Sequence, residues 1–318
     1  MAQLKQEVTL KVWSAAEGGD LILDATGLRI DFDIRLIPDF SRAKFIIYNL
    51  TEKAVQSMMS GDRYVTLTTQ LHNGTIYTLA NRFHLSNAVD ELKLPNRLTT
   101  LYCFDTMKLK LELPVEVTVL YPNLERMIQQ SCVNAGVTPP RAEDFISFPK
   151  GITKEPGLKE QRPLQGSLMS VFKTLEKEFN FLTFTDNGKF NFMYMPDIKN
   201  VGKTDLGERS PDVILSTRSM RSNPKIGIAS CKINSNLDGR IKPTTLMDLS
   251  QLLTVSPEAS EQTLELVDGY LKNFSDYSKY QAFTVQHKGS NYTAEWSTIV
   301  TGLSPTEGKL SPTVNWAQ

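Results

Sequence analysis

The stretch that most constrains the fold is residues 32–65, which read FDIRLIPDFSRAKFIIYNLTEKAVQSMMSGDRYV. An alternating strand leads through Pro38 into a second strand over residues 43–48, and a short helix follows at once. Either Asn49 or Thr51 can cap this helix, because each side chain can accept a hydrogen bond from a free backbone N–H. A Gly-Asp turn then leads into a third strand. The pattern indicates the wall of a β-barrel with a helix laid along it, and it favours assembly over catalysis.

Residues 1–112 form the first predicted domain. Alternating or β-rich segments predict further strands over residues 7–13, 21–25, 28–36, 65–70, 76–80, 83–90 and 98–104. Asn73-Gly74 lies between two of them and is typical of a hairpin turn, because both residues tolerate positive φ. So many strands in so short a span predict a barrel or a sandwich.

Residues 113–200 have a different hydrophobic pattern, which predicts helices as well as strands. Apolar residues at helical spacing predict helices over residues 123–135 and 167–179, and Ser167 is expected to serve as an ordinary N-cap. Residues 145–161 have the composition of a loop. A hairpin is expected over residues 181–195, with its turn at Asp186-Asn187-Gly188. We interpret this unit as a small α/β insert domain.

Residues 201–308 again have a pattern that predicts mostly β-strands, after a polar linker over residues 199–211. Strands are predicted over residues 225–234 and 246–255, a helix over residues 260–274, and a closing antiparallel pair over residues 280–287 and 294–303. Residues 309–318 form a mostly polar tail that carries Trp316. The fold class is therefore α+β and mostly β, with two tail-tube-like antiparallel β-barrel domains on either side of the insert.

Composition narrows the possible functions. Lys and Arg number 35, as do Asp and Glu, and the resulting formal charge of zero argues against electrostatic capture of nucleic acid as the main activity. Cys103, Cys132 and Cys231 are far apart and odd in number, so we expect reduced, partly buried thiols rather than a disulfide framework. No run of about 18 apolar residues predicts a transmembrane helix. We expect folding in a cytoplasm and no membrane insertion.

The sequence contains no catalytic signature. His72, His84 and His287 are scattered, and no two cysteines lie close enough in sequence to indicate a metal site. There is no Gly-x-Ser-x-Gly elbow, no Walker loop and no dinucleotide fingerprint. We therefore predict no catalytic residue, no metal and no cofactor, and we interpret the protein as a non-enzyme.

Two segments carry a family resemblance. Phe45-Ile46-Ile47-Tyr48-Asn49-Leu50-Thr51, followed by a helix and Gly61-Asp62-x-Tyr64-Val65, resembles the first domain of phage baseplate hub proteins, which join the tail tube to the central spike. The segment Val285-x-His287-x-Gly289, followed by Trp296-x-Thr298, resembles the closing strands of the second barrel in such hubs. The middle unit resembles their insert.

The resemblance implies a trimer whose two tube-like domains per chain make a pseudo-sixfold ring. It implies as partners the tail tube protein, the central spike protein and a tape measure protein. DNA would pass through the lumen without sequence-specific binding. The expected location is the tail baseplate of a virion, after assembly in the host cytoplasm. Within this picture, Tyr48, Asn49, Leu50 and Trp296 are the candidate interface residues.

Other functions stay open at the level of sequence. One is a tail-associated cell-wall hydrolase module, which would need a cleft with perturbed acidic residues. Another is a receptor-binding tail-tip protein, which would need exposed aromatic loops. A third is a tube component of a secretion system.

Overall fold

The computed structural model describes most of the chain. The described residues are 7–70, 74–120, 123–146, 148, 161–186, 188–195, 210–226, 230–252, 256–257, 279–293 and 296–303. The predicted linker over residues 199–211, the predicted helix over residues 260–274 and the tail over residues 309–318 lie wholly or almost wholly outside these ranges.

The N-terminal β unit matches the alternation of its sequence. Its elements are β1 (Glu7–Trp13), β2 (Leu21–Asp24), β3 (Ile30–Leu36), β4 (Arg42–Tyr48), α1 (Glu52–Met59), β5 (Tyr64–Gln70), β6 (Ile76–Lys93) and β7 (Asn96–Phe104). The strands are neighbours in the order β2-β1-β5-β6-β7-β4-β3. Along β1 and β3, every second side chain is buried, as expected for strands with one face on a core. The strand predictions for this unit are therefore largely confirmed.

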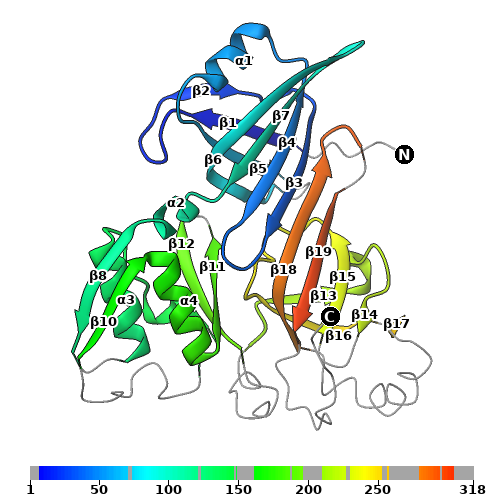
Figure 1. The fold of residues 1–318 in the computed structure, drawn as a ribbon. Helices are drawn as coiled ribbons and strands as arrows, with labels where there is room; N and C mark the ends of the chain where they lie inside the picture. The colour runs from blue at the N-terminus through cyan, green and yellow to red at the C-terminus, as the bar shows by residue number, and fades with distance from the viewer. Residues whose placement is uncertain are drawn as a thin grey trace.

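One difference concerns β6, where two separate strands were expected. The structure has a single strand of 18 residues, in which Arg82 adopts a positive φ of 54° and the register against β5 shifts. The irregularity bends the strand without interrupting its pairing, which is how a bulge acts. With β7, this strand forms a long hairpin that projects from the top of the molecule (Figure 1). Gly74 has the expected positive φ, whereas His72 and Asn73 lie outside the described residues.

The α/β insert has its own hydrophobic core. Its elements are α2 (Met107–Leu111), β8 (Pro114–Val119), α3 (Leu124–Asn134), β9 (Phe145–Ile146), β10 (Arg162–Ser167), α4 (Leu168–Phe179), β11 (Phe181–Asp186) and β12 (Lys189–Tyr194), with a 3-10 turn at Ala142–Asp144. Helices α3 and α4 and the hairpin β11–β12 confirm the sequence predictions. The short strands β8 and β10 pair with each other and were not predicted. Helix α4 and the paired strands enclose a core rich in phenylalanine.

The C-terminal β unit contains β13 (Val213–Ser216), β14 (Lys225–Ile226), β15 (Ser230–Asn236), β16 (Leu246–Gln251), β17 (Ser256–Pro257), β18 (Lys279–Ser290) and β19 (Ser297–Leu303), with a 3-10 turn at Thr217–Ser219. Strands β18 and β19 form the predicted closing antiparallel pair. Figure 1 shows this unit below the N-terminal one and beside the insert.

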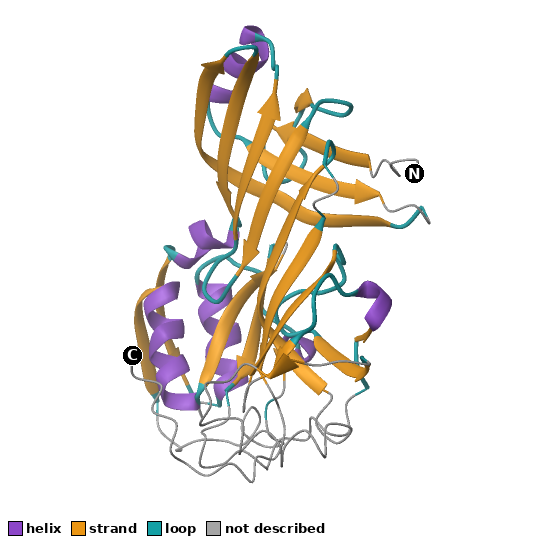
Figure 2. Cartoon of the chain, turned by 90° about the vertical axis from the view of Figure 1, so that its right-hand side faces the viewer, coloured by secondary structure: helices purple, strands orange, loops and turns teal. Residues whose placement is uncertain are grey.

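The two β units are joined by direct strand pairing. Strand β18 runs antiparallel to β3, from Val285 opposite Leu36 to Ser290 opposite Asp31. The result is one 14-stranded sheet, seen along its length in Figure 2, with a single buried cluster that draws side chains from both units. We call the β3–β18 pairing the seam.

The fold is therefore mostly β, as predicted. Among the described strands, the pairing runs as an open path from β17 to β2 and does not close on itself. Closure of each unit into a barrel of its own is not confirmed.

Candidate assembly interface

The first candidate residues form the corner between β4 and α1. Asn49 has a φ of 60°, in the left-handed region that asparagine tolerates better than most residues. Its side-chain oxygen accepts from the N–H of Arg97 at 3.0 Å, and its amide donates to Asn96 at 3.3 Å. Thr51 then caps α1 by accepting from the N–H of Ala54. Of the two possible caps, the structure uses Thr51, because Asn49 bonds to the β6–β7 hairpin instead.

Tyr48 belongs to a cluster at one end of the seam. Its hydroxyl donates to Asp31 at 2.7 Å, and the Arg29 guanidinium lies 4.1 Å from its ring centroid. The same guanidinium lies 5.1 Å from the ring of Tyr292, which is 70% exposed. Burial and the adjacent Asp31 raise the pKa of Tyr48. The tyrosine is thus a neutral hydrogen-bond donor that links β4 to β3.

Leu50 and Trp296 lie inside the fold. Leu50 is 5% exposed and belongs to the buried cluster of the β units. Trp296 is 8% exposed and packs edge to face on Phe32, with centroids 5.6 Å apart. Its indole N–H donates to the carbonyl of Thr293 at 3.1 Å. Both side chains therefore pack within one chain, and contact with a neighbouring subunit stays a prediction for all four candidates.

The seam depends on two residues that the sequence did not single out. A Cβ on Gly289 would lie 2.6 Å from the Phe32 ring, so only glycine lets this ring pack against β18. Asn291 accepts from the N–H of Ile30 at 2.9 Å and donates to the carbonyl of Leu28 at 2.6 Å. Asn291 thus closes the end of the seam in the way a further strand residue would.

The insert joins the β units through a second, more polar contact. Ser41 is fully buried, and its hydroxyl donates to the carbonyl of Thr185 at 3.2 Å. The N–H of Asp39 donates to the carbonyl of Thr183 at 2.9 Å, and Lys173 forms an ion pair with Asp39. On the side of the C-terminal unit, Lys242 pairs with Asp186 at 2.8 Å. We call this set of contacts the insert joint.

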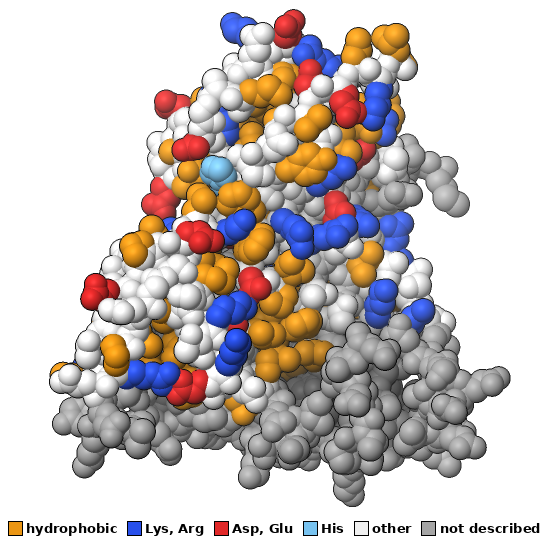
Figure 3. Space-filling model, viewed as in Figure 1, with side chains coloured by type: hydrophobic (Ala, Val, Ile, Leu, Met, Phe, Trp, Pro, Cys, Tyr) orange, Lys and Arg blue, Asp and Glu red, His pale blue; other side chains and the backbone are white. Residues whose placement is uncertain are grey.

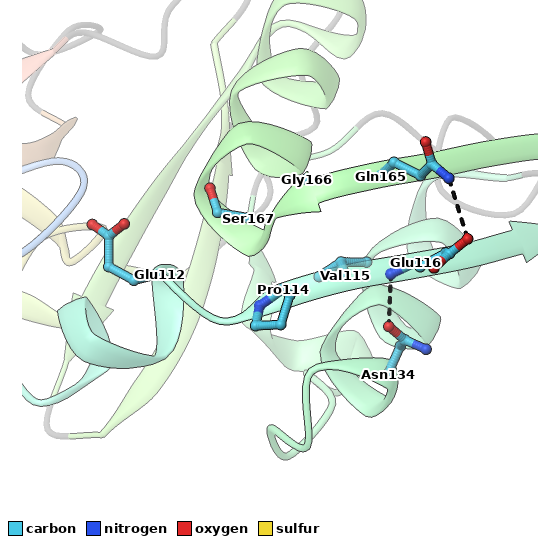
Figure 4. A pocket seen from close by; sticks show the side chains of 8 residues that line it. All are labelled: Glu112, Pro114, Val115, Glu116, Asn134, Gln165, Gly166 and Ser167. Carbon is cyan, nitrogen blue, oxygen red and sulfur yellow. Dashed lines mark hydrogen bonds between the residues drawn. The ribbon is translucent and has the colours of Figure 1, made fainter.

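The insert carries a pocket beside β8 and β10 (Figure 4). It is lined by Glu112, Pro114, Val115, Glu116, Asn134, Gln165, Gly166 and Ser167. Glu116 accepts from the Gln165 amide at 3.3 Å, and its backbone N–H donates to Asn134 at 2.8 Å. Ser167 caps α4, as predicted, by accepting from the N–H of Ser170. Among the described residues that line the pocket there is no histidine, cysteine or lysine, and the Ser167 hydroxyl serves as the cap of α4.

The remaining polar candidates have structural surroundings. His287 is 1% exposed, and burial lowers its pKa to about 4, against the attraction of Asp238. Its Nδ1 lies 3.0 Å from the Thr298 hydroxyl, which already accepts from the N–H of Asp238. The low pKa keeps the imidazole neutral at pH 7, and its tautomer decides which of the two groups donates. His84 lies 3.6 Å from Asp62, and His72 is outside the described residues.

The cysteines are free and buried, as expected. Burial raises the pKa of Cys132 to about 12 and raises those of Cys103 and Cys231 as well, so the thiols are protonated. Within the described ranges, no group of three or more His, Cys, Asp or Glu side chains could hold a metal ion. In the same part of the chain, no helix has the length and apolar character that a membrane span requires.

Known structures share this architecture. The 43 kDa tail protein of prophage MuSo2 from Shewanella oneidensis matches with a TM-score of 0.51 and 11% identity, over 94% of this chain and 98% of that one. The tail protein from Neisseria meningitidis MC58 matches with a TM-score of 0.52 and 9% identity, over 94% and 96%. The chain has the fold of phage tail proteins.

The same fold occurs in a secretion system. The E. coli c3393 protein, a component of the type VI secretion system with structural similarity to the T4 bacteriophage tail proteins gp27 and gp5, matches with a TM-score of 0.52 and 10% identity. The match covers 89% of this chain and 76% of that one. No protein-family model and no curated protein sequence matches the chain. The likeness therefore lies in the fold and not in recognisable sequence.

Proposed function

We propose that this chain is a structural baseplate hub protein of a phage tail. Three copies would form a pseudo-sixfold ring that joins the tail tube to the central spike and surrounds the DNA exit channel. The observation that supports this most is the seam. It makes the two β units one continuous wall, in a fold shared with tail proteins over almost their whole length.

The seam suits a ring that must match a sixfold tail tube on one side and a threefold spike on the other. A chain with two tube-like domains contributes two units, so three chains present six units to a sixfold tube and three identical faces to a threefold spike. The first unit would comprise residues 1–112, the insert residues 113–200, the second unit residues 201–308 and the tail residues 309–318. Each β unit would complete its barrel-like shape within the ring.

Open sheet edges would join neighbouring copies. Strand β2 pairs only with β1 among the described strands, which leaves one of its backbone edges for another chain. Unpaired edges attract further strands, and assembly of a ring is one way to cover them. Tyr48 and Asn49 lie at the corner that leads into α1, the helix that contacts β2, and are proposed to face a neighbour. The role of Leu50 and Trp296 would be to hold that corner and the seam in shape.

The proposed partners follow from this position in a tail. They are the tail tube protein, the central spike protein and a tape measure protein, with DNA passing through without sequence-specific contacts. The protein would be assembled in the host cytoplasm, would not insert into a membrane, and would reside in the virion. It would act mechanically, as a non-enzyme without a cofactor.

A second candidate is the corresponding component of a contractile secretion system. The match to the E. coli c3393 protein favours it, because that protein is a type VI secretion component with the same fold. The two functions share the ring and differ in what the channel carries.

The ring is tested by mass measurement in solution and by electron microscopy of tail particles. We expect a trimer by light scattering, and a ring containing this protein between tube and spike. Leu21→Lys puts a charge on the exposed edge strand β2, where Leu21 is 45% exposed, and should weaken the trimer. Leu120→Lys, at a leucine that is 51% exposed on the insert, is the matched control and should leave it intact.

The two variants separate the parts of the proposal. A trimer that survives Leu21→Lys as well as it survives Leu120→Lys would contradict pairing through β2 only. A protein that stays monomeric at every concentration, and is absent from the ring in particles, would overturn the hub function itself.

A further inference from the structure

A hollow on the exposed face of the sheet combines aromatic rings with basic side chains. It lies over β3, β4 and β7, and we call it the cationic hollow. Its rings are Phe40, Tyr102 and Phe104, and its basic side chains are Arg35, Arg42 and Lys44, with Lys108 at its margin. Figure 3 shows Lys and Arg side chains gathered in a band across the middle of the molecule. The hollow borders the seam through Asp33 and Arg35 of β3, and no residue of the insert joint lines it.

Within the described part of the chain, the positive charge of the hollow is only partly neutralised: Asp33 pairs with Arg35 and lies opposite Lys44 in the register of β3 and β4. Among the described residues, no acidic group lies within 4.0 Å of Arg42, Lys44 or Lys108 in an ion pair. The hollow contains one acidic residue, Asp33, which already accepts from Arg35 at 3.2 Å and from Gln286 at 2.6 Å. In a chain with zero formal charge, this is a local excess of cations.

Strand pairing places some of these cations against each other. In the register of β3 and β4, Arg35 lies directly opposite Arg42. Like charges at directly opposed positions destabilise a sheet. A bound anion would offset this repulsion, so the arrangement fits a surface that is covered by a negatively charged partner.

The rings indicate what kind of anion fits. The Lys44 ammonium lies 5.8 Å from the Tyr102 centroid, and that of Lys108 lies 4.7 Å from Phe40 and 5.0 Å from Phe104. The ammonium groups cover one face of each ring, which hinders the flat stacking of bases by which single strands use aromatic residues. The rings still line the hollow, so smaller apolar side chains can contact them there. A duplex backbone would meet the cations but would bring no apolar group to the rings. A polypeptide can supply both carboxylates and apolar side chains.

Spacing supports an extended polypeptide. Arg42 and Lys44 are alternate residues of β4 and point to the same face, about 6.6 Å apart along the strand. Alternate side chains of an extended segment have the same spacing. We propose that the cationic hollow binds an extended segment of a partner protein in which acidic residues alternate with apolar ones, with carboxylates on Arg42 and Lys44 and apolar side chains against Phe40 and Phe104.

The test uses the full-length protein and a fluorescein-labelled synthetic peptide of alternating Glu and Leu, measured by fluorescence anisotropy. We expect saturable binding that weakens with salt. The double variant Arg42→Gln/Lys44→Gln should bind about tenfold more weakly, the size expected when two partly exposed charge pairs are lost. The matched control Lys53→Gln/Arg141→Gln removes one exposed lysine and one exposed arginine elsewhere and should bind like the wild type.

Two further measurements separate the peptide from other anions and from unfolding. A peptide of alternating Glu and Ser tests the rings and should bind more weakly than the Glu-Leu peptide. The melting temperature of Arg42→Gln/Lys44→Gln should change little, because the loss of repulsion between Arg42 and Arg35 offsets the loss of the pairing between Lys44 and Asp33. Absence of Glu-Leu binding would overturn the proposal. Equal binding of both peptides, or displacement of the peptide by a short duplex DNA at equal concentration, would do the same.

Discussion

The seam and the insert joint connect parts of the same chain in opposite ways. At the seam, two β units share a hydrogen-bonded ladder and one buried cluster, with Phe32 and Trp296 packed across it. At the insert joint, contact is made mostly by hydrogen bonds and ion pairs around Ser41 and Lys173, with a ring contact of Phe184 on Phe283, while the insert keeps its own core. Burial of apolar surface stabilises strongly, whereas exposed ion pairs contribute little.

The contrast teaches which parts of the molecule should move together. A shared apolar core makes the two β units one cooperative body. The insert has a separate core, and its boundary holds a ring contact, Phe184 on Phe283 with centroids 6.1 Å apart, beside hydrogen bonds and ion pairs. We therefore expect the insert to open on its own, as locally connected units with few shared apolar contacts do. For a protein proposed to stand in a ring, this means a rigid wall with a separately folded attachment.

The largest expected effect is that of Trp296→Ala at the seam. Loss of a buried tryptophan should lower the free energy of unfolding by about 3–5 kcal/mol. In hydrogen exchange, β4 of the N-terminal unit and β19 of the C-terminal unit should lose protection together. The matched change in the insert is Phe172→Ala, at a side chain that is 1% exposed, and it should expose the insert alone. Loss of protection in β19 while β4 stays protected would contradict the claim that the two β units unfold together.

Acid should lower the stability of the joined β units through protonation of His287. This residue lies on β18 opposite Ile34, and burial lowers its pKa from 6.5 to about 4. The unfolded chain takes up the proton first, so stability is complete above about pH 6.5 and falls as the pH drops toward 4. The loss should reach about 3 kcal/mol, which is the pKa difference expressed as free energy.

The measurement is urea unfolding across this pH range, with His287→Gln as the control that cannot titrate. The difference between the two proteins should shrink steadily below about pH 6.5. The insert, residues 113–200, contains no histidine. Its exchange should therefore be less sensitive to pH in this range, and an insert that opened first would contradict the assignment.

Local pattern predicted most of the individual elements. Alternation predicted β1, β3 and β4, helical spacing predicted α3 and α4, and the position of Ser167 predicted its role as a cap. Strands β8 and β10 were missed, because each is short and largely solvent-facing and includes a proline. Proline and exposure weaken the usual strand signal.

The seam could not be predicted in this way. It pairs residues 31–36 with residues 285–290, and nothing in either strand alone specifies a partner so far along the chain. Contact of Trp296 with a neighbouring chain stays a prediction, but its packing on Phe32 of the other β unit could not be predicted from the sequence. The one local sign of the seam is Gly289, which leaves room for the rings of Phe32 and Trp296. Its meaning is clear only once β18 is known to pair with β3.

The smallest expected effect is that of Ser41→Ala at the insert joint. The change removes a buried hydrogen bond to the carbonyl of Thr185, which should cost about 1 kcal/mol. Because this bond lies between the insert and the β units, the cost should appear as faster exchange in β11, with little change in β3 or β18. Ser86→Ala is the matched control, since the Ser86 hydroxyl also donates to a strand carbonyl, that of Tyr102, but within one β unit and in an exposed position. If Ser41→Ala destabilised the whole chain in one transition, the insert would unfold together with the β units. The seam and the insert joint would then differ in the type of contact but not in cooperativity.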